Sequence, residues 1–146
     1  SWTYKKDDGT FERNKPIELL HKFIQDNVLS LFDPCDIYII GFSQGALMCY
    51  EGILTMDISF GGVFPICGFM ALNNKQYNYP HPALKNTPIY IGHGKNDNVV
   101  SVESSKEAYN IIKNANFNVE LCIYSGGHKI GIDYLRKMKS VIKQKK

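Results

Sequence analysis

The pentapeptide Gly41-Phe42-Ser43-Gln44-Gly45 places a serine between two glycines, at a point where the hydrophobic pattern of the chain changes. Before it, residues 37–40 form an apolar run without polar alternation, which is typical of a strand buried on both faces. After it, apolar residues recur at helical spacing from residue 46 to residue 54. A G-x-S-x-G turn between a strand and a helix is the nucleophile-elbow pattern. The sequence therefore predicts that Ser43 is a nucleophile.

The tightness of this turn has two further consequences. We expect a side chain at Gly41 or at Gly45 to collide with neighbouring backbone, which explains the glycines. The backbone N–H of Gln44, at the start of the helix, should point toward an oxyanion that forms beside Ser43. Gln44 is therefore the predicted oxyanion-hole residue.

A serine hydroxyl is a weak nucleophile at neutral pH, so it needs a base within hydrogen-bond reach, and that base must be held by an acid. Folds built around this elbow carry the three groups in the chain order serine, acid, histidine. Asp97 follows a predicted strand over residues 88–94, and His128 follows a predicted strand over residues 118–124. Both then lie at the C-terminal edge of the sheet, where open sheets of this kind place their sites. We predict a catalytic triad of Ser43, Asp97 and His128.

The other candidates for base and acid have simpler explanations. His21 lies within a predicted helix, and His81 lies within a polar loop. His93 ends a strand just before Asp97, and we expect it to order that loop rather than to act as the base. Two aspartates near element ends are interpreted as turn or cap residues, Asp36 and Asp57.

The elements that must position these residues alternate along the chain. The predicted strands cover residues 37–40, 61–67, 88–94 and 118–124, and the predicted helices cover residues 16–31, 46–54, 102–114 and 131–143. Residues 1–14, which are polar around Asp7-Asp8-Gly9, and residues 73–87 are predicted loops. Strands separated by helices imply an α/β fold whose parallel sheet is flanked by helices joined through right-handed crossovers. We expect one domain over residues 1–146.

Length, charge and cysteine usage narrow the class of protein. The formal net charge of +3 over 146 residues is weak, and the lysines of the last ten residues are typical of a solvated helix rather than of a nucleic-acid site. We expect no transmembrane segment and no signal peptide. The predicted triad chemistry implies no metal and no organic cofactor. The cysteines lack metal-ligand spacing and three of them fall within apolar segments, which favours reduced core thiols and a cytoplasmic location. These cysteines are Cys35, Cys49, Cys67 and Cys122.

Apolar residues near the predicted strand ends are candidates for an acyl-binding wall. They are Phe42, Phe69, Met70 and Leu72. Each of them would also suit a hydrophobic core, and that alternative stays open. The loop over residues 73–87 is either plain surface or a pocket roof formed by Tyr77, Tyr79 and His81.

These motifs resemble the α/β-hydrolase serine esterases, specifically the acyl-protein thioesterase, carboxylesterase and lysophospholipase group. "GFSQGA" at 41–46 resembles the elbow of that group, "HGKNDNVVSVESSKEAYNII" at 93–112 its acid segment, and "YSGGHKI" at 124–130 its histidine turn. The initial "SW" resembles a tryptophan-containing stretch before its first long helix. The small fungal-type serine hydrolases share the "GFSQGA" form and remain an alternative. The resemblance implies hydrolysis of a carboxylic ester or a fatty-acyl thioester by way of an acyl-enzyme.

The resemblance covers nearly the whole chain but only the later part of the family's domain. It implies further strands upstream, and a His-Gly loop that donates a second oxyanion N–H. We therefore expect the natural protein to carry on the order of 60–80 residues upstream, given ~5–6 strands per sheet. In the chain alone, the edge of strand 37–40 would be uncovered and open to association with another chain. Two alternatives to an active enzyme stay open, a non-catalytic binding module with the same fold and an inactive fragment of a longer esterase.

Overall fold

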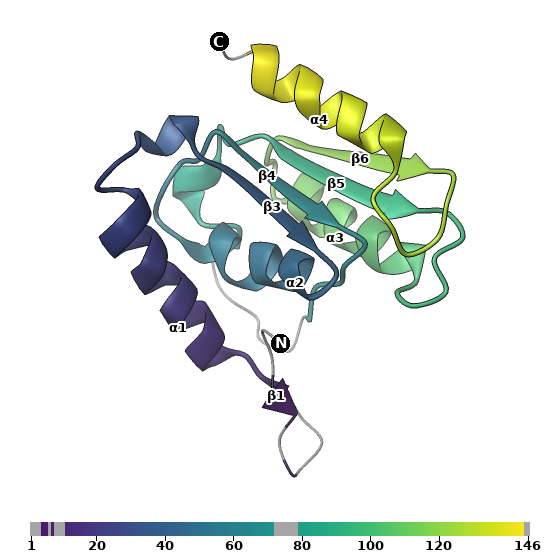
Figure 1. Cartoon of the computed structure of the whole chain (residues 1–146), viewed down its shortest axis with the longest axis horizontal. Helices are drawn as coiled ribbons and strands as arrows, with labels where there is room; N and C mark the ends of the chain where they lie inside the picture. Colours follow the sequence, from purple (N-terminus) through teal and green to yellow (C-terminus); the bar gives the residue numbers. More distant parts are fainter. Residues whose placement is uncertain (1–3, 6, 8–10, 72–78, 145–146) are drawn as a thin grey trace.

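The computed structural model describes residues 4–5, 7, 11–71 and 79–144, and a four-stranded parallel sheet forms its centre (Figure 1). The strands are β3 (Tyr38–Phe42), β4 (Gly62–Ile66), β5 (Ile89–Gly94) and β6 (Val119–Tyr124). They lie side by side in chain order, and each neighbouring pair is parallel. The predicted α/β architecture is confirmed, and each predicted strand overlaps an observed one.

Helices form a layer on each face of this sheet (Figure 1). They are α1 (Asn14–Phe23), which continues as a π-helical segment over Ile24–Val28, α2 (Gln44–Glu51), α3 (Val102–Asn114) and α4 (Ile132–Gln144). The helices α2 and α3 cover one face with α1 beside α2, whereas α4 lies on the other face. None of the helices in the described part of the chain is long and apolar enough to cross a bilayer.

Alternation along the strands builds a hydrophobic core on each face. Val63 and Ile91 face α2 and α3, whereas Phe64 and Ile66 face α4 and pack with Tyr134 of that helix. All five side chains are fully buried. Period-two alternation of this kind is what places successive side chains of a strand on opposite faces. The two cores hold the strands in place and thereby fix the positions of their C-terminal ends.

The strand β3 is not buried on both faces, so that part of the sequence prediction is wrong for this chain. Ile39 packs into the core beneath α2, but Ile40 is 52% exposed and Phe42 is 36% exposed. The reason is that α4 packs against β6, at the opposite edge of the sheet. In the part of the chain that the structure describes, no strand pairs with the outer edge of β3.

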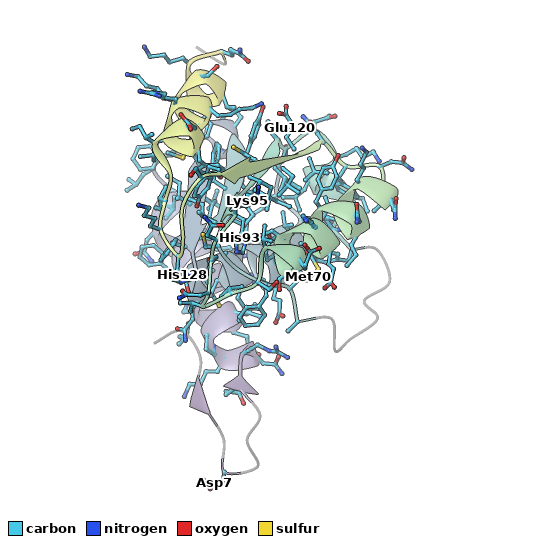
Figure 2. The ribbon with its side chains drawn as sticks, turned by 90° about the vertical axis from the view of Figure 1, so that its right-hand side faces the viewer. Asp7, Met70, His93, Lys95, Glu120 and His128 are labelled. Carbon is cyan, nitrogen blue, oxygen red and sulfur yellow. The ribbon has the colours of Figure 1, made fainter. Side chains whose placement is uncertain are left out.

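The N-terminal segment departs from the predicted loop. The short strands β1 (Tyr4–Lys5) and β2 (Phe11–Glu12) pair antiparallel, with Tyr4 opposite Glu12. The next helix begins at Asn14 rather than at Pro16, because the Glu12 carboxylate accepts the N–H of Asn14 at 3.0 Å. Figure 2 shows Asp7 at the far tip of this hairpin, remote from His128. Asp7 therefore takes no part in the arrangement of the strand ends (Figure 2).

We expect residues 1–146 expressed alone to self-associate through the outer edge of β3, because an unpaired, apolar strand edge pairs readily with another chain. Ile40→Lys places a charge on that edge and should shift the mass measured by light scattering toward the monomer over a concentration series. Ile132→Lys is the matched control, because Ile132 is 60% exposed on α4. A chain that is monomeric at every concentration, or that responds equally to both changes, would contradict this expectation.

Candidate active site

Ser43 stands at the junction between β3 and α2 in a strained backbone conformation. Its φ is 55° and its ψ is −113°, a region that residues other than glycine rarely occupy. Its N–H donates to the carbonyl of Ile66 at 2.9 Å, and its own carbonyl accepts the N–H of Ala46 at 3.0 Å. Such strain persists only where the surroundings fix it, and here it presents the serine side chain at the sheet edge.

The two glycines of the elbow differ in how much space surrounds them. A Cβ at Gly41 would lie 2.2 Å from the carbonyl oxygen of Gly45 and 2.6 Å from the Sγ of Cys49, so only glycine fits there. A Cβ at Gly45 would have no atom within 4 Å. The expected collision is thus present at Gly41 and absent at Gly45. The prediction for Gly45 was wrong because the first turn of α2 faces an open cavity at that point.

The structure places the three predicted triad residues in one hydrogen-bonded line. The Nε2 atom of His128 lies 3.1 Å from the Ser43 Oγ, and its Nδ1 atom lies 2.7 Å from the Asp97 Oδ2. A carboxylate only accepts, so Nδ1 carries the proton and Nε2 is left to accept the serine hydroxyl. The residues come from the ends of β3, β5 and β6. This geometry suits proton removal from Ser43, and the catalytic roles themselves stay predictions.

The carboxylate of Asp97 is buried, and it is held from two sides. Its Oδ1 atom accepts the backbone N–H groups of Val99 and Val100, each at 2.9 Å, and its Oδ2 atom faces His128. Burial by itself raises the pKa of Asp97, but the hydrogen bonds from Val100, His128 and Val99 outweigh it and lower that pKa to about 2. Asp97 is therefore a fixed negative charge behind the imidazole of His128.

A second histidine also contacts the carboxylate of Asp97. His93 is fully buried, and its Nε2 atom lies 2.9 Å from the carbonyl of Val100 and 3.2 Å from the Asp97 Oδ2. Two acceptors at Nε2 place the proton there, so Nδ1 accepts the hydroxyl of Ser105 at 2.6 Å. His93 thus ties the Asp97 loop to α3, which agrees with the expectation that it orders that loop.

The other histidines and aspartates that were candidates for the base or the acid have structural roles. His21 bonds the carbonyl of Gly52 at 2.7 Å, and the ring of His81 accepts the N–H of Ala83 at 3.2 Å. Asp36 closes a short 3₁₀ turn. Asp57 lies in the connection that leads to β4.

The loop that carries Asp97 and the loop that carries His128 are joined by their backbones. Lys95 N–H donates to the carbonyl of Tyr124 and Asn96 N–H to that of Gly126, both at 2.8 Å. A Cβ at Gly94 would lie 2.2 Å from the carbonyl oxygen of Gly127, so this approach requires glycine. Figure 2, viewed from the side where the strands end, shows His93, Lys95 and His128 together. The acid and the base are therefore placed by one rigid unit.

A cavity of about 590 Å³ opens beside Ser43, along the outer edge of β3. Phe42, Gln44 and Met48 are among its lining residues, and Leu20 reaches it from α1. The ring of Phe42 lies 4.8 Å from that of His128, centroid to centroid. An apolar group bound here would lie next to the serine.

The remaining acyl-wall candidates divide between surface and core. Phe69 is 38% exposed, whereas Met70 packs against the core beneath α2. Tyr79 also packs against that core and donates its hydroxyl to the carbonyl of Tyr50 at 3.0 Å, so it does not roof the cavity. Leu72 and Tyr77 lie outside the described residues.

Sequence reasoning missed one residue of this site, Cys67. It directly follows β4 and is fully buried, which by itself suits a reduced core thiol. In the structure its Sγ atom, a carboxylate oxygen of Asp97 and a ring nitrogen of His128 all lie within 4.8 Å of one another. The signal was available, because the C-terminal ends of neighbouring parallel strands meet at one edge.

The chain is similar to known proteins over nearly its whole length. A family model described as phospholipase/carboxylesterase matches residues 3–146. A probable carboxylesterase of Oryza sativa subsp. japonica is 31% identical over 130 residues, which are 88% of this chain and 49% of the relative. An acyl-protein thioesterase 1 of Debaryomyces hansenii is 30% identical over 115 residues, 77% of this chain and 50% of the relative. The chain thus spans about half the length of these relatives.

Solved structures show the same fold. The crystal structure of SOBER1 from Arabidopsis thaliana superposes with a TM-score of 0.79 at 25% identity, and covers 99% of this chain and 73% of that one. The carboxylesterase of Bacillus cereus superposes with a TM-score of 0.78 at 22% identity, over 97% of this chain and 66% of that one.

The two elbow glycines should respond differently to alanine. Gly41→Ala forces a Cβ into the Gly45 carbonyl and should lower the free energy of unfolding by about 1–3 kcal/mol. Gly45→Ala enters open space in the first turn of a helix, where alanine is favoured by up to about 1 kcal/mol, and should cost nothing. Urea unfolding of the two variants beside the wild type measures the difference. Equal destabilisation by both would refute the packing described here.

Asp97 should stabilise the fold in a pH-dependent way. Its pKa is about 2 in the folded chain, against about 3.9 for an unfolded aspartate, so folding favours the ionised form. The stabilisation is present above the unfolded pKa and is lost as the pH falls through the folded one. We expect the difference in unfolding free energy between wild type and Asp97→Asn to shrink by on the order of 2 kcal/mol between about pH 5 and pH 2. A difference that is independent of pH in this range would show that the carboxylate is not held as described.

Proposed function

The chain belongs to the phospholipase/carboxylesterase family, and on this premise we propose that it is a serine hydrolase that cleaves carboxylic esters or fatty-acyl thioesters through an acyl-enzyme. The observation that supports this most strongly is the line of hydrogen bonds from Ser43 through His128 to Asp97. The names of the relatives, carboxylesterase and acyl-protein thioesterase, support the same class of bond.

In the proposed reaction, the Oγ of Ser43 attacks the carbonyl carbon while its proton moves to Nε2 of His128. The tetrahedral intermediate collapses, and His128 returns that proton to the departing alcohol or thiol. Water then attacks the acyl-enzyme, with His128 taking the water's proton and giving one back to Ser43 as the acid leaves. Asp97 stays ionised throughout and stabilises the imidazolium, which its lowered pKa of about 2 allows.

The negative charge on the substrate oxygen needs hydrogen-bond donors beside Ser43. We assign one of them to the backbone N–H of Gln44, the first residue of α2 and the neighbour of the nucleophile. Loss of one oxyanion donor typically costs about 10²–10³ in kcat, so turnover depends on every donor of the oxyanion hole as well as on the activation of Ser43. A covalent probe of the serine avoids this difficulty.

The substrate assignment extends only to a class. We propose that the acyl group lies against Phe42, whose ring borders both His128 and the cavity.

None of the four cysteines forms a disulfide, which supports an intracellular location, where thiols stay reduced.

A fluorophosphonate probe should label Ser43 in the wild-type chain, because the probe reacts only with an activated serine. Ser43→Ala should abolish labelling, His128→Ala should reduce it to near background, and the double variant should equal either single one, because the two residues act as a unit. Asp97→Asn should retain more labelling, since Asp97 only positions and supports the base. The probed site is read by mass spectrometry of the labelled peptide.

The control for this experiment is Ser30→Ala, which removes an exposed serine remote from the site and should label like the wild type. Absence of labelling in a folded wild-type chain would favour the alternative of a non-catalytic binding module. Labelling that persists in His128→Ala would point to a different base.

A further inference from the structure

Cys67 is held rigidly beside the triad. Its φ is 49°, a strained value for a residue with a side chain, and its N–H donates to the carbonyl of Gly92 at 2.8 Å. Its Sγ atom lies 3.2 Å from the hydroxyl of Tyr124, which itself donates to the carbonyl of Lys129 at 2.6 Å. The sulfur also lies 3.7 Å from the same Lys129 carbonyl oxygen, so Cys67, Tyr124 and Lys129 form one hydrogen-bonded group. The sulfur is therefore fixed at the sheet edge, and the proposed reaction does not use it.

Three different ligand atoms converge at this point. The Cys67 sulfur, an Asp97 carboxylate oxygen and a His128 ring nitrogen lie within 4.8 Å of one another. Around a tetrahedral ion with bonds of about 2.0–2.3 Å, ligand atoms stand roughly 3.3–3.8 Å apart. The separations between the three atoms thus need to change by about 1.5 Å at most for them to share one ion. They come from the ends of β4, β5 and β6, which the two cores hold in place.

The chemistry of the set selects the kind of ion. A thiolate, an imidazole and a carboxylate together suit Zn²⁺, whereas Mg²⁺ and Ca²⁺ prefer oxygen ligands alone. Groups that hydrogen-bond to the ligand residues, and so orient them, are also present. The Oδ1 of Asp97 is anchored by Val99 and Val100, and the hydroxyl of Tyr124 stands next to the sulfur. Partners of this sort orient ligands in metal sites.

We propose that Cys67, Asp97 and His128 form an inhibitory Zn²⁺ site. The ion would replace the proton of the Cys67 thiol, which passes to solvent, and would take Asp97 as a second ligand. The proton on Nδ1 of His128 would move to Nε2, so that His128 binds the ion through Nδ1 as a neutral imidazole. His128 could then no longer pair with Asp97 or act as a base toward Ser43, so the serine would lose its activation. The inhibitory effect rests on the proposed function, whereas the binding of the ion does not.

The experiment uses residues 1–146 freed of metal with a chelator. Calorimetric titration should show one Zn²⁺ bound per chain, and Co²⁺ should give the near-ultraviolet sulfur-to-metal absorption band that marks a thiolate ligand. Fluorophosphonate labelling of Ser43 should fall with the same midpoint as Zn²⁺ binding, and Mg²⁺ at the same concentrations should have no effect.

Two cysteine variants make the assignment specific. Cys67→Ser should weaken Zn²⁺ binding at least about tenfold and remove the Co²⁺ band. Cys35→Ser is the matched control, because Cys35 is an exposed thiol beside Asp33 and is the obvious rival ligand; it should bind like the wild type. Labelling is normalised to the metal-free rate of each variant, and circular dichroism checks that each one folds.

Each outcome decides one proposal. Loss of binding in Cys35→Ser, or a Co²⁺ complex without the thiolate band in the wild type, would overturn the site. Binding with the thiolate band but unchanged labelling would overturn inhibition alone. If metal-free Ser43 fails to label, the proposed function fails, and calorimetry with the Co²⁺ band still decides whether the ion binds. The band is read on the wild type, so the test stands even if Cys67→Ser does not fold.

Discussion

The carboxylate of Asp97 is the point at which the parts of the site meet. Burying an ionised carboxylate is costly unless hydrogen bonds compensate for lost water. Here the backbone of its own loop, His128 and His93 supply those bonds. Because the bonds favour the charged form, they lower the pKa of Asp97 and fix its position at the same time. The orientation of His128, and through it the environment of Ser43, depends on this one group.

The elbow between β3 and α2 fixes the position of Ser43, as the hydrogen bonds of Asp97 fix the position of His128. The strained backbone of Ser43 is held by its bond to the end of β4 and by the close approach of Gly41 to Gly45. Cys67, directly after β4, has a positive φ as well. Two strained residues therefore lie side by side at adjacent strand ends, where functional sites tend to concentrate strain. This placement brings the Cys67 thiol next to His128 and Asp97, which form one hydrogen-bonded line with Ser43.

The relatives that the chain matches are longer than the chain, so the position of the site within the matched residues matters for its function. The described sheet carries Ser43, Asp97 and His128 after the ends of three of its four strands, so all three residues of the proposed triad lie within the residues matched. The cavity beside Ser43 is bounded by β3, an edge strand in this part of the molecule. In the proposed reaction, the size of the acyl group would depend on what borders that cavity. The chain spans about half the length of the curated relatives it matches.

The sequence by itself determined the α/β architecture and the members of the site that follow strand ends. Apolar runs separated by segments of helical periodicity specify a parallel sheet. The C-terminal ends of parallel strands meet at one edge, so the sequence was enough to predict that Ser43, Asp97 and His128 lie close together. Tertiary structure decided what depends on distance and on neighbours. It left Ile40 exposed because α4 packs against β6, gave Gly45 open space, and packed Met70 against the core. It also set the Cys67 sulfur beside the triad, because periodicity reports which face a side chain takes but not which atoms it meets across the sheet edge.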